Sequence, residues 1–216
     1  TNPSHFESIF YLASLSAQTK NFNMAKEMFE KAVKIQPDYA AAYSNLGAVL
    51  KELGNFKGAM AACEKAIEIE PNNSIAFSNL GAVLKELGNF KQAITACEKA
   101  IKIEPNNLDA HHNLALALQE LGEIKKAIIC YEKLSKIQSN PANAYQNLGK
   151  LYVMLGESKE AKNFYQLATK YDPENLSYYY NLSDLDRKIL DKNFKKKIDK
   201  IIIKKKHEKK NLAYAN

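Results

Sequence analysis

The sequence predicts an all-α fold, an α-solenoid of stacked antiparallel helix pairs. The first observation is internal repetition, because residues 40–73 and 74–107 agree at 27 of 34 positions. A fixed period of this length is typical of stacked helical repeats, since one helix pair cannot bury its apolar face alone. The second observation is that Gly and Pro recur at fixed places in the period, where helices are expected to begin and end.

The same 34-residue frame divides most of the chain into repeats. Five full repeats cover 6–39, 40–73, 74–107, 108–141 and 142–175. Residues 1–5 are expected to form a lead-in, with Asn2-Pro3-Ser4 as a turn and helix cap. A partial sixth repeat with a divergent basic capping helix is expected over 176–210, and residues 211–216 are expected to be a truncated tail.

Within each repeat, a short turn separates two predicted helices. In the third repeat the turn is Leu87-Gly88-Asn89, where Gly can adopt the left-handed conformation that ends one helix and Asn can cap the next. The second helix is expected over 90–103. The small residues Gly81 and Ala93 are expected to let the two helices approach closely. The first repeat differs, because Lys20 occupies the place of the turn glycine.

The spaced pattern of the third repeat resembles that of the tetratricopeptide repeats. The matching residues are Phe77, Leu80, Gly81, Leu84, Gly88, Phe90, Ala93, Cys97, Ala100 and Pro105. The resemblance extends over about residues 6–190. It implies a right-handed superhelix whose concave surface is lined by the first helix of every repeat. Cys63 and Cys97 replace the usual aromatic residue of the second helix, which changes packing volume but not the pattern.

One polar residue recurs at the sixth position of the repeat. The five asparagines are Asn45, Asn79, Asn113, Asn147 and Asn181. A primary amide offers two donors and an acceptor, so a ladder of amides could bind the N–H and C=O groups of an extended peptide. The arrangement resembles the asparagine ladder in the repeat arm of O-linked N-acetylglucosamine transferases. The alternative is that these asparagines brace neighbouring helices.

Around the ladder, the predicted concave face is mixed and nearly neutral. The further residues expected to contact a peptide there are Ser44, Ser78, His112, Lys51, Lys85 and Lys150. The face lacks the set of lysines, asparagines and arginine with which related arrays hold a terminal carboxylate, so the sequence argues against a receptor for chaperone tails.

The sequence contains no recognisable catalytic or metal-binding motif, and we expect neither enzyme activity in this chain nor a cofactor. His111 and His112 are adjacent, so on a helix they point about 100° apart and cannot easily share a metal. Cys63, Cys97 and Cys130 fall in successive second helices, too far apart for disulfides, so we expect free buried thiols. Free thiols favour a reducing compartment, and a cytoplasmic protein without a membrane span is expected.

The positive charge is concentrated at the end of the chain. Residues 187–216 carry 12 Lys and Arg against 3 Asp and Glu, within a total net charge of +7. Apolar residues recur there at helical spacing, at Leu190, Phe194, Ile198, Ile201 and Ile202. The pattern favours a helix whose apolar face covers the last repeat, which has its own first helix over 176–189. Contact with a following domain, or with nucleic acid or an acidic membrane, is the alternative for its lysines.

Two functional hypotheses follow from these observations. The first is a scaffold that binds a protein or an extended peptide, with homo-oligomers forming through the solenoid ends. The alternative is the substrate-recognition or assembly arm of a larger enzyme, a sulfotransferase or glycosyltransferase, with its catalytic domain beyond residue 216. Residues 178–216 loosely resemble the connector of repeat arms that precede sulfotransferase domains, although they contain no phosphosulfate-binding motif. A synthetic consensus scaffold is a third interpretation, which the irregular first, fourth and fifth repeats argue against.

Overall fold

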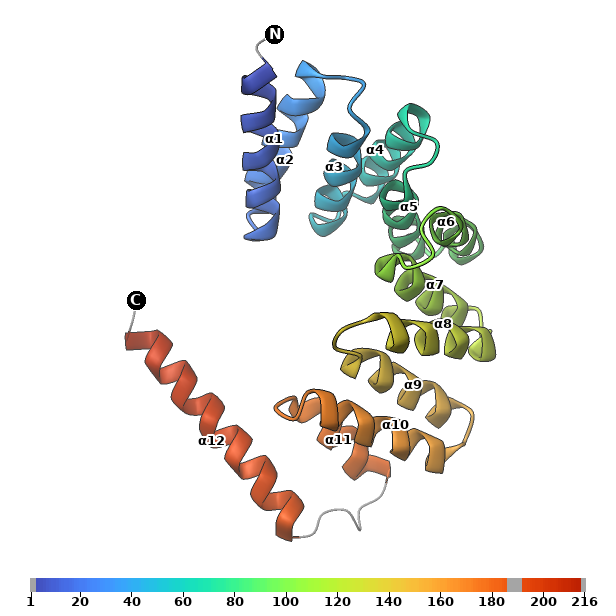
Figure 1. Cartoon of the computed structure of the whole chain (residues 1–216), viewed down its shortest axis with the longest axis vertical. Coiled ribbons are helices and arrows are strands. Elements are labelled where there is room, and N and C mark those ends of the chain that lie inside the picture. Colours follow the sequence, from blue (N-terminus) through green and yellow to red (C-terminus); the bar gives the residue numbers. More distant parts are fainter. Residues whose placement is uncertain (1–2, 186–191, 215–216) are drawn as a thin grey trace. The chain divides into compact units, whose positions relative to one another are not determined.

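The computed structural model describes residues 3–185 and 192–214, and within them the chain contains twelve helices and no strand. Between residues 3 and 103, consecutive helices pack side by side in pairs as hairpins (Figure 1). Their bounds are α1 (Pro3–Gln18), α2 (Phe22–Ile35), α3 (Ala40–Glu52), α4 (Phe56–Ile69), α5 (Ser74–Glu86), α6 (Phe90–Ile103), α7 (Leu108–Glu120), α8 (Ile124–Ile137), α9 (Ala142–Met154), α10 (Ser158–Tyr171), α11 (Leu176–Leu185) and α12 (Lys192–Tyr214). The predicted all-α fold of helix pairs is confirmed.

The chain forms two compact units, residues 1–130 and 131–216, and the division falls within α8. In the first compact unit, α1 packs on α2, α3 on α4, and α5 on α6. Successive hairpins are joined by contacts of α2 with α3, α4 with α5, and α6 with α7. In the second compact unit, α10 packs against both α9 and α11.

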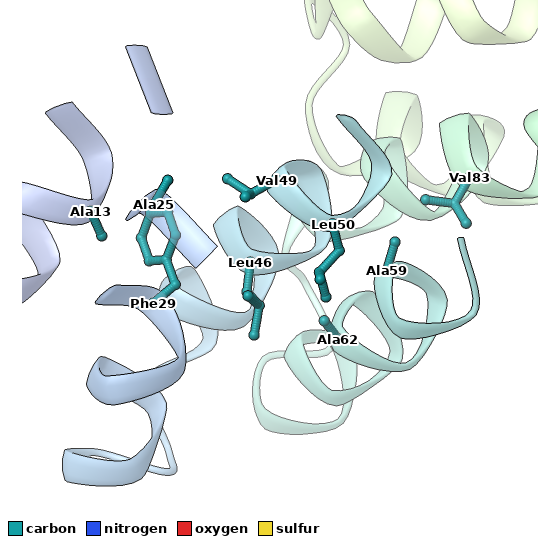
Figure 2. Packing of buried hydrophobic residues seen from close by; sticks show 9 residues of the cluster. All are labelled: Ala13, Ala25, Phe29, Leu46, Val49, Leu50, Ala59, Ala62 and Val83. Carbon is teal, nitrogen blue, oxygen red and sulfur yellow. The ribbon is translucent and has the colours of Figure 1, made fainter. Parts of the chain in front are cut away.

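Small residues allow the two helices of a hairpin to approach each other. Figure 2 shows Ala13, Ala25 and Ala59 among the larger side chains of a core that runs from α1 to α5. In the third repeat, a Cβ atom added to Gly81 would collide with the Cys97 sulfur and lie 3.3 Å from the Ala93 carbonyl oxygen. The close approach expected at Gly81 is therefore confirmed, and Ala93 is fully buried beside it.

A residue in the left-handed backbone conformation ends the first helix of each of the five full repeats. Gly54 and Gly88 have φ angles of 75° and 77°, as the turn pattern predicts. In the first repeat Lys20 adopts the same conformation, with φ 61°, although a side chain disfavours it. The asparagine that follows is the N-cap of the next helix. Asn55 accepts a hydrogen bond from the Gly58 N–H at 3.1 Å, whereas the Asn89 side chain makes no capping bond.

The two ends of the chain differ in detail from the expectation. Helix α1 already begins at Pro3, inside the predicted lead-in, which agrees with the preference of proline for the first turn of a helix. Helix α11 is described as far as Leu185. The rest of the helix predicted over 176–189, and Leu190, lie outside the described residues.

Helix α12 contacts the end of the second compact unit through part of its apolar face. Phe194 packs against a cluster that contains Tyr165 and Leu182, and its ring lies 5.5 Å from the Tyr179 ring in an edge arrangement. Ile201 is buried, but Ile202 is exposed, so the expectation that both cover the repeats is wrong for Ile202. Adjacent residues on a helix point about 100° apart, and one narrow face cannot bury both.

Candidate functional site

The five repeated asparagines lie at the same register of five first helices, and every one is partly exposed. Asn45, Asn79 and Asn113 belong to α3, α5 and α7 of the first compact unit. These three helices contact one another in sequence, so their asparagines follow each other along one side, which we call the ladder face. Asn147 and Asn181 belong to α9 and α11 of the second compact unit.

The asparagines of the ladder face are not equivalent. The Asn79 side-chain N–H donates to the Ser44 carbonyl oxygen at 3.0 Å, which joins α5 to the preceding first helix α3. Among the described residues, the side chains of Asn45 and Asn113 make no hydrogen bond. One asparagine therefore braces the stack, as the alternative interpretation expects, while its two neighbours keep donors and acceptors for another molecule.

In the second compact unit, the two asparagines at this register also differ from each other. The Asn147 side chain makes no hydrogen bond within the described part of the chain. The Asn181 side-chain nitrogen is buried and has no hydrogen-bond partner among the described residues. Because a buried nitrogen is not open to a peptide, Asn181 is a weaker candidate for ligand contact than Asn147.

Two predicted contact residues lie in the interior. Ser44 and Ser78 are only 1% and 2% exposed, so a ligand on the surface cannot reach their hydroxyl groups. Ser44 donates instead to the Ala40 carbonyl oxygen at 3.1 Å. The two serines therefore lie in the interior and not on the predicted concave surface. A serine at this register is short enough for its neighbours to cover it, whereas the larger His112 at the same register is exposed.

The charges of the ladder face are largely neutralised. Lys51 pairs with Glu52 at 2.9 Å, and Lys85 pairs with Glu86 at 3.0 Å. Partial burial of the ring, and then the charge of Lys85, lower the pKa of His112, although Asp109 opposes them. His112 is therefore neutral at pH 7. Lys150 is exposed on α9, in the other compact unit.

The remaining residues with reactive side chains have structural surroundings. His111 is buried, and its Nε2 atom lies 2.9 Å from the Pro105 carbonyl oxygen, which confirms its expected packing role. Cys63, Cys97 and Cys130 are free and buried, as predicted. Burial raises the pKa of Cys63 and of Cys97 to about 12, so neither is a reactive thiolate near pH 7. In the described residues no three His, Cys, Asp or Glu side chains form a group that could hold a metal ion.

A cavity whose lining includes none of the ladder asparagines was not predicted. Its volume is about 590 Å³, and its lining is Pro71, Asn72, Phe77, Lys99, Lys102 and Ile103. The Lys99 ammonium lies 5.4 Å from the centre of the Phe77 ring, a cation–π arrangement. The sequence contains one indication of this cavity, because Lys102 stands where the second repeat has Glu68. In the second repeat, Glu68 forms an ion pair with Lys65 at 2.9 Å.

No described helix is both long enough and apolar enough to cross a lipid bilayer.

Comparisons with known proteins agree on one repeat family. Family models described as tetratricopeptide repeat match residues 7–39, 40–73, 74–107 and 107–174. The comparison with curated proteins found no match.

Solved structures of the same architecture are similar to this chain at low sequence identity. PilF of Pseudomonas aeruginosa matches with a TM-score of 0.76 and 20% identity, over 94% of this chain and 90% of its own. TTC0263 of Thermus thermophilus matches with a TM-score of 0.69 and 19% identity, over 83% and 98%. YrrB, described as a TPR protein with an unusual peptide-binding site, matches with a TM-score of 0.62 and 22% identity, over 80% and 89%. At these identities the likeness concerns the fold.

Proposed function

We propose that this chain, which belongs to the tetratricopeptide repeat family of protein-interaction scaffolds, binds the main chain of an extended peptide on its ladder face. The observation that carries the proposal is the difference between the braced Asn79 and the two amides beside it. Asn45 and Asn113 are partly exposed and make no hydrogen bond with another described residue. They are the side chains that we assign to peptide contact, together with Asn147 in the second compact unit.

The spacing of the helices suits an extended ligand. Packed helices lie about 8 to 10 Å apart, and an extended chain advances about 3.3 Å per residue. Successive ladder positions would then meet about every third residue of the peptide. An amide can donate to a peptide C=O and accept from a peptide N–H, so these contacts depend little on the ligand's side chains.

The charge of the ladder face argues for a ligand without a strong net charge. Lys51 and Lys85 are already paired with glutamates, and His112 is neutral at pH 7. The fold of YrrB, a protein described as having a peptide-binding site, supports the choice of ligand class.

The proposal is tested with peptides selected from a random linear library displayed on phage. For a selected peptide, Asn45→Ala and Asn113→Ala are each expected to weaken binding about fivefold to tenfold, since a hydrogen bond contributes about 1 kcal/mol. Fluorescence anisotropy measures the dissociation constant, and urea denaturation shows whether the variants remain equally stable. Asn106→Ala, in an exposed turn, is the matched control and should bind like the wild type.

The hydrogen bond from Asn79 to the Ser44 carbonyl oxygen predicts that a substitution of Asn79 affects stability. The Asn79→Ala variant should lose about 1 kcal/mol of unfolding free energy, because the part-buried Ser44 carbonyl loses its donor. If the double variant Asn45→Ala/Asn113→Ala binds selected peptides as tightly as the wild type, the amides are not the contact residues and the proposal is wrong.

The hypothesis of an arm within a larger enzyme uses the same ladder face, with catalysis in a further domain. An immunoblot of source cells distinguishes the two proposals. A band near 24.3 kDa supports an independent scaffold, whereas a product of twice that mass or more supports the arm. The three free thiols agree with a reducing compartment, which is the basis for proposing a cytoplasmic location. Cell fractionation probed with the same antibody tests that location.

A further inference from the structure

Two cavities on the third repeat share Phe77 and Lys99, and together they form one groove, which we call the Phe77 groove. The larger cavity has a volume of about 590 Å³, within the range of about 300 to 1,000 Å³ that is typical of ligand pockets. The smaller cavity, of about 210 Å³, adds Leu80, Leu84, Gln92, Thr95 and Ala96 to the lining. One end of the groove is therefore mainly apolar, and the other end includes Lys102.

The Phe77 groove is a place where the third repeat departs from its near copy, the second repeat. The two repeats differ at seven of 34 positions, and four of these seven line the groove in the third repeat. The four residues are Phe77, Gln92, Thr95 and Lys102, which stand where the second repeat has Tyr43, Gly58, Ala61 and Glu68. One of the exchanges reverses a charge, so the groove of the third repeat differs in chemistry from the same surface of the second.

The two lysines of the groove have no carboxylate partner in the part of the chain that the structure describes. Lys99 lies over the Phe77 ring, with 5.4 Å between its ammonium group and the ring centre. Neither Lys99 nor Lys102 forms an ion pair with another described residue, and both are exposed. In the second repeat Lys65 pairs with Glu68 at 2.9 Å. Because Lys102 replaces that glutamate, two positive charges remain together in the third repeat.

Three glutamates lie close to the groove in the sequence, but none of them lines it. Glu98 lines a different cavity on α6. The carboxylates of Glu70 and Glu104 each accept a hydrogen bond from an asparagine of their own turn, at 2.7 and 3.4 Å. The positive charge of the groove is therefore available to another molecule.

We propose that the Phe77 groove binds an acidic linear segment of a partner protein. A large apolar side chain would occupy the smaller cavity, and a neighbouring carboxylate would pair with Lys99 and Lys102. Nucleic acids are also negative, but their affinity comes from many phosphate contacts, and an apolar cavity beside only two lysines suits a peptide better. The lysine-rich helix α12 of this chain does not match the charge of the groove.

The Phe77 groove is separate from the ladder face. Asn79 follows Phe77 by two residues, which is about 200° around the helix, so the two side chains leave α5 in nearly opposite directions. Neither cavity of the groove includes a ladder asparagine in its lining. The groove is thus a second binding surface, and it differs from the ladder face in having a net positive charge.

A selection from a random linear peptide library on phage tests the proposal. The library is first depleted on the immobilised Lys102→Glu variant and then selected on the wild-type chain. The recovered peptides should contain Asp or Glu beside a large apolar residue. In fluorescence anisotropy, Lys102→Glu should weaken their binding about tenfold, because an attraction is lost and a repulsion is gained. Lys34→Glu is the matched control, since Lys34 is an exposed lysine at the same register of the first repeat and lines neither cavity.

A second variant tests the apolar end of the groove. Thr95→Phe should weaken binding about fivefold by filling part of the smaller cavity, and circular dichroism should remain unchanged because Thr95 is exposed. Recovered peptides that Thr95→Phe leaves equally well bound would contradict the apolar contact.

Three further outcomes would overturn the proposal. The first is that no peptide prefers the wild type to Lys102→Glu, and the second is that the recovered peptides are not acidic. The third is that single-stranded oligothymidylate binds more tightly than these peptides and depends on Lys102, which would assign the groove to nucleic acid. The double variant Asn45→Ala/Asn113→Ala should bind the recovered peptides like the wild type, so failure of this proposal is distinguishable from failure of the ladder face.

Discussion

The first repeat, residues 6–39, and the third repeat, residues 74–107, form the same helix pair with different residues at its key positions. The turn has Lys20 in the first repeat and Gly88 in the third, yet both residues adopt the left-handed backbone conformation. At the ladder position Tyr11 replaces the asparagine that in the third repeat joins two helices. The comparison shows that the helix pair forms despite these exchanges. Which of its surfaces are buried depends on the repeats that pack beside it.

The contact between the two helices of each hairpin also differs. In the first repeat Ala13 and Phe29 occupy the positions that Gly81 and Cys97 occupy in the third. All four residues are buried. A methyl group is accommodated at Ala13, but at Gly81 it would collide with the Cys97 sulfur. Helix spacing is therefore adjusted separately in each repeat by the pair of residues at this contact.

The largest expected effect concerns the buried thiols that the first repeat lacks. Burial raises the pKa of Cys63 and Cys97 from 9.0 to about 12. Their contribution to stability is therefore complete below pH 9 and is lost as the pH rises toward 12, because only the unfolded chain then releases these protons. At pH 10 the loss is about 1.4 kcal/mol per thiol.

Urea denaturation from pH 8 to pH 10 measures this effect in the wild type and in Cys63→Ala/Cys97→Ala. The double variant should start from a lower stability because of the cavities, but should lose less as the pH rises. Tyrosines and lysines titrate in both proteins, so the difference in slope isolates the thiols. Equal slopes would contradict the prediction.

The next effect tests the hairpin contact. Gly81→Ala should lower the unfolding free energy by about 1 to 3 kcal/mol through overpacking, since the added methyl group meets both a sulfur and a backbone carbonyl. Adding Cys97→Ala should recover part of that loss by removing the sulfur. If Gly81→Ala is as stable as the wild type, the helices of the third repeat can separate as they do around Ala13, and the contrast between the repeats is lost.

The smallest effect concerns the turn. Lys20→Gly should stabilise the chain by about 0.5 to 1 kcal/mol, because glycine adopts a positive φ without the cost that lysine bears. The reverse exchange, Gly88→Lys, should destabilise by a similar amount. Both are measured by urea denaturation. A destabilised Lys20→Gly variant would show that the Lys20 side chain supports the turn.

Much of the fold could be predicted, because repetition multiplies each local signal. Helix α6 covers 90–103, as the position of its turn and of Pro105 indicated. The left-handed glycines, the close contact at Gly81 and the free buried cysteines were also expected from residue type and period. The bracing bond of Asn79 appeared only as one of two alternatives, since its acceptor is a carbonyl 35 residues earlier.

The residues around the ladder show where prediction failed. The register of Ser44 and Ser78 predicted that they are on the surface, but their short side chains are covered by neighbouring residues. The cavity beside Phe77 depends on Lys99, Lys102 and a turn from the preceding repeat, and no single repeat contains all of its walls. Such sites arise from neighbouring repeats, so the pattern within one repeat cannot locate them.

The sequence by itself determined the period, the helix pair, the turn positions and the recurrence of one asparagine per repeat. These features depend on local backbone preference and apolar spacing, which are properties of residues close together along the chain. Only the tertiary structure decided which asparagine braces its neighbour and which remain open. It also decided that Leu12 and Leu15 are exposed while Leu46 and Val49, their counterparts in the second repeat, are buried. The physical reason is that burial and hydrogen bonding of a repeat depend on the helices stacked beside it.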